Sequence, residues 1–154
     1  MTLIIDGHLD LAYNALYHRR DLTQPVQVLR EREDPYRDGV APSQVHPDAL
    51  RKQPRTDMPG VATVALPEMR AGRVGIVLST IMSRVQLPNP VLGDGMRTQL
   101  AAHAMGQAHL HYYRALERQG QLSFIRSAQD LEQAATTWQG GGADRPVGLI
   151  LSME

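Results

Sequence analysis

Apolar residues in this chain form two kinds of pattern, short continuous runs and longer stripes with helical spacing. The continuous runs predict buried strands at residues 3–5, 74–82, 122–125 and 146–154. The stripes predict helices over residues 9–20, 63–73 and 96–119. Strands that alternate with helices are typical of parallel β/α units, so we expect an α/β fold whose strands all end on one side of the sheet.

The longest predicted helix, residues 96–119, has a stripe that we expect to be buried. Its members are Leu100, Ala104, Ala108, Tyr112, Ala115 and Leu116. Three histidines share this segment, but no two of them are four residues apart, the spacing that sets two imidazoles on one helical face. We therefore expect His103, His109 and His111 to be exposed or partly exposed rather than metal ligands. A further helix is predicted after Ser127, an N-cap residue with Asp130 three positions later.

Residues 21–59 differ in composition from the rest of the chain. Six of the ten prolines lie here, charges of both signs are dense and apolar residues are sparse. This composition predicts a long loop rather than a core element. Loops of this length in compact domains are usually functional or disordered. The segment therefore either walls a substrate pocket at the strand ends or is a solvated surface insertion.

The composition as a whole narrows the classes of function. A length of 154 residues suits one domain, and 16 basic residues balance 16 acidic ones, so charge favours neither nucleic acid nor an anionic membrane as a partner. Cysteine is absent, which excludes disulfides and thiolate metal sites. Neither a signal-peptide pattern nor a bilayer-spanning apolar run is present, so we expect a cytoplasmic protein.

His8 and Asp10 follow the first apolar run. Side chains two residues apart in an extended backbone point to one face, so this imidazole and carboxylate can meet at a single point. Both groups are ordinary zinc ligands. The alternative for His8 is a hydrogen-bonded histidine at a strand end. A second pair with the same spacing, His46 and Asp48, lies in the proline-rich segment with no strand before it, and we do not expect it to bind metal.

Three blocks of sequence carry a resemblance to a known family. Residues 6–11 read DGHLDL, residues 66–75 read LPEMRAGRVG, and residues 148–154 read GLILSME. In this order and placement, the blocks resemble the membrane (renal) dipeptidase family of zinc metallopeptidases, which belongs to the amidohydrolase superfamily of barrel hydrolases. The second block of the family often has an acidic residue two positions before the proline, where this chain has Ala65.

The resemblance implies a fold, a site and an activity. The fold is a TIM-type (β/α)8 barrel in one domain, of which residues 1–154 would supply roughly the first half. His8 and Asp10 correspond to ligands of one of two zinc ions, and Glu154 corresponds to the carboxylate that bridges both. The other ligands and the acid and base groups come from later strands in the family. The implied activity is hydrolysis of the peptide bond of a dipeptide by a water activated between the ions.

Half a barrel would leave sheet edges open, so we expect the 154-residue chain to be inactive by itself. The remainder of the barrel would come from a longer polypeptide or a second chain, and a homodimer is compatible with the sequence. Without the resemblance, Glu154 would be interpreted as a solvated terminal residue.

Two other functions remain open. Another amidohydrolase-type enzyme, such as a lactonase or a phosphotriesterase, would use the same first strand. Those relatives commonly carry a second histidine where this chain has Asp10, and a carboxylated lysine as the bridge in place of Glu154. The third alternative is a non-catalytic module for metal binding or protein interaction, which the incomplete ligand set would favour.

Overall fold

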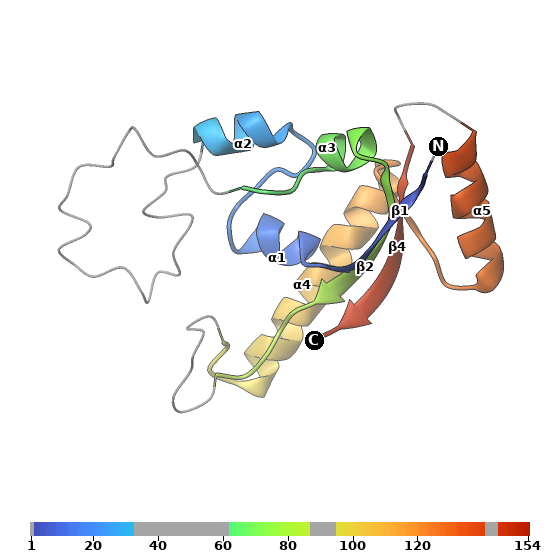
Figure 1. The fold of residues 1–154 in the computed structure, drawn as a ribbon. Coiled ribbons are helices and arrows are strands. Elements are labelled where there is room, and N and C mark those ends of the chain that lie inside the picture. Colours follow the sequence, from blue (N-terminus) through green and yellow to red (C-terminus); the bar gives the residue numbers. More distant parts are fainter. Residues whose placement is uncertain (1, 33–61, 87–94, 141–144) are drawn as a thin grey trace.

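A computed structural model describes residues 2–32, 62–86, 95–140 and 145–154 (Figure 1). Four strands form one sheet in the order β1-β2-β4-β3, and every neighbouring pair is parallel. The strands are β1 (Ile4–Leu9), β2 (Val74–Ile81), β3 (Leu122–Phe124) and β4 (Val147–Met153). The predicted α/β class with a parallel sheet is therefore confirmed.

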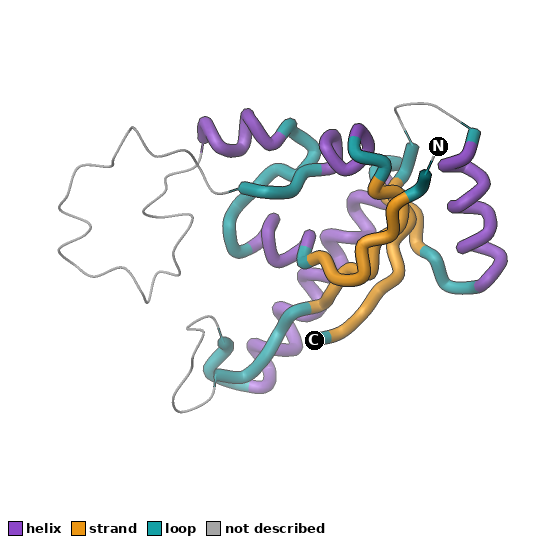
Figure 2. Tube along the Cα trace, viewed as in Figure 1, coloured by secondary structure: helices purple, strands orange, loops and turns teal. Residues whose placement is uncertain are grey.

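In the described ranges, five helices connect and cover the strands, and Figure 2 shows the helices packed around the strands. The helices are α1 (Leu11–Leu16), α2 (Val26–Arg32), α3 (Leu66–Ala71), α4 (Gln99–Arg118) and α5 (Ala128–Gln139). Three of them, α1, α2 and α3, lie between β1 and β2 in the chain. In Figure 1, α1 and α3 lie to the left of the strands, α4 passes behind them and α5 lies to the right. No helix in the described ranges is long and apolar enough to cross a membrane.

The centre of the sheet is β2, as its nearly continuous apolar sequence predicts. Ile76 and Val77 are at most 1% exposed, because β1 and β4 flank the strand and helices cover it. Two polar residues near its carboxyl end, Ser79 and Thr80, are buried as well. Gly75 lets the ring of Trp138 in α5 approach the strand, since a Cβ built at Gly75 would lie 2.4 Å from that ring.

The first strand differs from its prediction. Residues 3–5 were expected to be a buried strand, but β1 continues to Leu9 and both Ile4 and Ile5 are exposed, by 46% and 58%. The reason is position, because β1 is an edge strand and, among the described residues, pairs only with β2. Residues 146–154 were also expected to be a buried strand, but the carboxyl end of β4 is exposed, with Met153 at 80%.

The long helix α4 buries only part of the predicted stripe: Leu116 is buried as predicted and Tyr112 is partly buried against the core, but Ala104 is exposed. Its buried residues are His109, Tyr113 and Leu116, whereas Leu100 is 78% exposed. Figure 1 shows the start of α4 beyond the carboxyl end of β2, so little of the described part of the chain covers its first turns. The prediction for the histidines is therefore wrong at His109, which is fully buried. His103 and His111 are exposed as expected.

The predicted loop at residues 21–59 contains a helix, α2, so the prediction is wrong over that part. Val26 and Leu29, three residues apart, form a small apolar stripe that packs into the core. The N–H of Val26 also donates to the Glu68 carboxylate of α3 at 3.0 Å. Residues 33–59, and with them His46 and Asp48, lie outside the described part of the chain.

Two helix boundaries follow their sequence signals. Pro67 lies in the first turn of α3, where its missing N–H costs no hydrogen bond, and Gly72 ends the helix. The side chain of Ser127 accepts the N–H of Asp130 at 3.1 Å and so caps α5. The Asp130 carboxylate in turn accepts the N–H of Arg126, which is the main reason why the pKa of Asp130 is lowered.

Candidate metal centre

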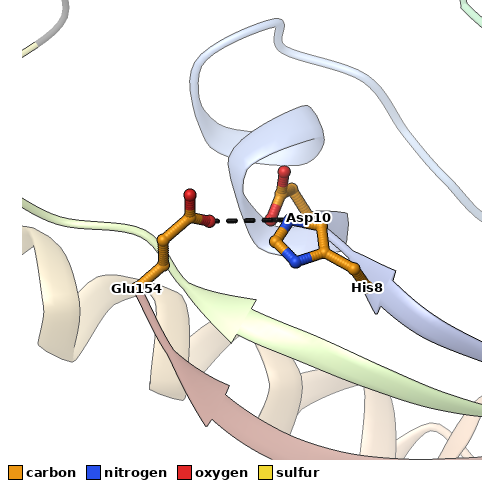
Figure 3. A group of neighbouring side chains, drawn as sticks. All are labelled: His8, Asp10 and Glu154. Atoms are coloured by element: carbon orange, nitrogen blue, oxygen red, sulfur yellow. Dashed lines mark ion pairs between the residues drawn. The ribbon is translucent and has the colours of Figure 1, made fainter.

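His8, Asp10 and Glu154 converge at the carboxyl ends of the strands (Figure 3). Each offers one ligand atom, and all three atoms lie within 4.8 Å of one another. Nε2 of His8 lies 3.5 Å from an oxygen of Asp10 and 3.6 Å from an oxygen of Glu154. The structure therefore brings together the three residues that the sequence singles out.

The parallel sheet explains why residues so distant in sequence meet. In the register of the sheet, Leu9 pairs with Ser79 of β2, and Ile81 of β2 pairs with Met153 of β4. The residues that follow β1 and β4 therefore leave the sheet at the same edge. Glu154 is held there by its own backbone, because its N–H donates to the carbonyl of Ile81 at 3.2 Å.

A register shift in β1 helps to orient His8. Asp6 pairs with Val77 and Leu9 with Ser79, so β1 uses one more residue than β2 over this stretch. An extra residue of this kind is a β-bulge, which bends the strand and re-aims a side chain. The N–H of His8 donates to the carboxylate of Asp6 at 3.0 Å, which holds the bulge from within.

Asp10 is the N-cap residue of α1, but its side chain does not cap the helix. Its carboxylate accepts a hydrogen bond from the hydroxyl of Thr80 in β2 instead. The N–H of Ala12 donates to the hydroxyl of Tyr113 at 3.1 Å, and that hydroxyl donates to the carbonyl of Thr80 at 2.8 Å. The sequence alone does not single out Thr80 or Tyr113. The sequence shows only that Thr80 is a hydroxyl residue at the end of an apolar run, and it does not indicate that Thr80 bonds to Asp10.

The donor set and its exposure fit a metal ion. Imidazole nitrogen and carboxylate oxygen are both zinc ligands, and a catalytic zinc site also needs an open position. The side chains of His8 and Glu154 are 60% and 52% exposed, which leaves room for further donors, whereas Asp10 is only 28% exposed. A cation would also relieve the repulsion between the two carboxylates. These residues could therefore hold a metal ion.

A second histidine lies close to the centre without joining it. Nδ1 of His109 accepts the N–H of Met82 at 3.3 Å, whereas its Nε2 has no hydrogen-bond partner among the described residues. Burial lowers the pKa of His109, and the negative charge of Asp10 opposes this effect only in part. Burial therefore favours the neutral form of the His109 imidazole.

Comparison of the sequence with models of protein families finds no match, and comparisons with curated proteins and with solved structures find none either. The functional interpretation therefore depends on the residues of the site and on the three sequence blocks that resemble the dipeptidase family. Two of these blocks contain the converging residues, His8 and Asp10 in the first and Glu154 in the third.

Proposed function

We propose that this chain is the N-terminal part of a zinc-dependent dipeptidase with a TIM-type barrel. The observation that carries the proposal is the convergence of His8, Asp10 and Glu154 within 4.8 Å at the carboxyl edge of a parallel sheet. Barrel enzymes place their chemistry at this edge. The order of the three sequence blocks supports the choice of a dipeptidase among the metal-dependent hydrolases.

The arrangement of the strands supports a barrel that continues beyond β4. β1, β2 and β4 lie side by side in the sheet, are all parallel and follow one another in ascending chain order, as barrel strands do, although the short β3 lies between β2 and β4 in the sequence. β3 departs from that order, but it pairs only with residues 147–149 of β4. On that side, residues 150–153 have no strand partner in the described ranges, so a further strand could add there.

The three residues would hold metal in different ways. His8 would donate an imidazole nitrogen and Asp10 a carboxylate oxygen to one ion, and the resemblance assigns Glu154 the role of reaching both ions. When bound, two zinc ions supply Lewis acidity, which acidifies water and polarises an amide carbonyl. The hydrogen bond from Thr80 keeps the Asp10 carboxylate in place for this role. The remaining ligands and proton-transfer groups would come from the rest of the barrel.

The proposed substrate is a dipeptide with a free amino group and a free carboxylate. The test uses the full-length product of the gene, stripped with a chelator and reloaded with zinc. We expect two zinc ions per site and hydrolysis of unblocked dipeptides, with little hydrolysis of the same dipeptides acetylated at the amino group. The 154-residue chain alone should bind zinc more weakly and show no turnover, because part of its ligand set is missing.

Other results would select the alternative functions. Two bound ions with hydrolysis of lactones or phosphotriesters, and no hydrolysis of dipeptides, would indicate another amidohydrolase-type enzyme. A full-length product that binds no metal and hydrolyses none of these substrates would contradict the proposal and favour an interaction module.

A further inference from the structure

We infer that Tyr113 caps helix α1 in place of Asp10 and that Tyr113 and Thr80 are positioning residues, which together keep the Asp10 carboxylate available for metal. The inference depends on the proposed metal centre, which includes Asp10. It adds two residues from α4 and β2, neither of which belongs to the three ligands.

An N-cap aspartate normally caps the helix that it precedes. Its carboxylate accepts the N–H of the second or third residue of the helix that follows. In α1 the second residue is Ala12, and its N–H donates to the Tyr113 hydroxyl at 3.1 Å. The backbone of Asp10 has φ of −88° and ψ of 60°, and its side chain forms no capping bond. A residue 101 positions away from Ala12 thus fills the role that Asp10 would otherwise fill.

The carboxylate of Asp10, which does not cap α1, contacts β2 instead. It accepts the hydroxyl of Thr80, a residue only 3% exposed, at the end of the central strand. The carbonyl of the same Thr80 accepts the hydroxyl of Tyr113 at 2.8 Å. One tyrosine therefore joins the start of α1 to the end of β2. Thr80, fixed in this way, holds the carboxylate on the side of His8 and Glu154.

Water cannot easily replace the hydroxyl of Tyr113. Tyr113 is fully buried, and its burial raises the pKa of the phenol to about 12, so it stays protonated and can donate. Without the hydroxyl, the Ala12 N–H would be buried without a partner, which is costly. The usual acceptor for an N–H at this helix position is the side chain of the N-cap residue, which in α1 is Asp10. Capping by Asp10 would then compete with binding of the metal.

The test measures zinc affinity by titration of the chelator-stripped full-length product of the gene. We expect Tyr113→Phe and Thr80→Val each to lower the affinity about 10–100-fold, the usual effect of removing an outer-shell partner. Thr80→Ser keeps the hydroxyl and should restore the wild-type affinity. Tyr112→Phe is the matched control, because Tyr112 is the next tyrosine on α4 and forms neither the bond to Ala12 nor the bond to Thr80, and it should leave the affinity unchanged. Cobalt-loaded protein adds a second readout, since loss of the Asp10 ligand should change the visible absorption bands of the metal.

The outcomes separate this inference from the proposed function. If wild-type protein binds zinc and the Tyr113→Phe and Thr80→Val variants bind it equally well, the positioning roles are wrong while the metal centre stands. If wild-type protein binds no zinc, the metal centre is wrong and the inference falls with it. If Tyr113→Phe does not fold, the zinc affinities of Thr80→Val and Thr80→Ser are compared instead. Equal zinc affinities of these two variants would overturn the inference.

Discussion

Nε2 of His8 lies 3.6 Å from a carboxylate oxygen of Glu154, although the strands that lead to them, β1 and β4, are separated in the sheet by β2. Both side chains reach across the end of the central strand. The site is therefore a property of the whole sheet edge, because it forms only when three parallel strands end at the same level.

Removal of either partner of this contact should abolish tight metal binding. We expect His8→Ala and Glu154→Gln to lower zinc affinity by more than the roughly 10–100-fold that loss of an outer-shell partner costs, because each removes a direct ligand. Isothermal titration with zinc measures the effect. His103→Ala is the control, since His103 is exposed on α4 and lies outside the cluster. Equal losses in all three variants would argue against the site.

Because α5 packs closely against β2, we expect alanine substitutions at Gly75 and at Gly7 to differ in their effect on stability. Gly75→Ala should destabilise the protein by about 1–3 kcal/mol, because the new Cβ would lie 2.4 Å from the ring of Trp138, which is only 2% exposed and cannot move aside. Gly7→Ala is the matched control in β1, where a Cβ meets nothing within 4 Å. Urea denaturation measures both changes, and similar midpoints for the two variants would contradict this account of the packing.

Loss of the N-cap of α5 should destabilise the protein less than the substitution at Gly75. Ser127→Ala should lower the free energy of unfolding by about 1 kcal/mol, because it removes the acceptor for the N–H of Asp130. Ser127→Asn should retain most of the stability, since asparagine is an equally good N-cap residue. Thermal denaturation followed by circular dichroism distinguishes the two. A loss for Ser127→Asn as large as that for Ser127→Ala would mean that the hydroxyl matters for another reason.

Buried His109 predicts a dependence of stability on pH. Burial lowers its pKa in the folded state below the ordinary value of 6.5, so between the folded value and 6.5 the unfolded chain binds more protons than the folded chain. Stability should therefore rise with pH through this window and fall as the solution is acidified. Melting temperatures measured between about pH 5.5 and pH 7.5 would show the trend.

The control for this effect is His109→Gln, which removes the titrating group and keeps an acceptor for the N–H of Met82. The other five histidines are unchanged in this variant, so the difference in slope between the two proteins belongs to position 109. The variant should show a shallower fall in melting temperature on acidification. An unchanged slope would mean that His109 does not contribute to the acid sensitivity.

The local signals in the sequence were sufficient for the type of most elements. Val74–Ile81 is a buried strand because β-branched and apolar residues follow one another without a polar face. Ser127 starts α5 because its side chain serves an N–H three residues later. His8 and Asp10 could be paired from their spacing at the end of an apolar run, a context that His46 and Asp48 lack. These features depend on neighbours a few positions away, which the sequence displays directly.

Burial could not be predicted in the same way. Apolar Ile5 is exposed because β1 is at the edge of the sheet, and polar His109 is buried because α4 packs that face against β2 and α1. The stripe predicted for α4 was right at Leu116 but missed His109 and Tyr113, the other two buried residues of this helix. Position in the sheet and the rotation of a helix depend on contacts between elements far apart in the chain.

The sequence by itself thus determined the β/α character of the chain, the cap of α5 and the pairing of His8 with Asp10 as candidate ligands. Glu154 was expected with this pair only through the family resemblance, and the tertiary structure shows that it meets them and that Tyr113, rather than Asp10, caps α1. The physical reason is the distance along the chain over which each interaction acts. Hydrogen bonding within a turn and side-chain periodicity act over a few residues, whereas the site depends on the register of three strands and on a bond across 101 positions.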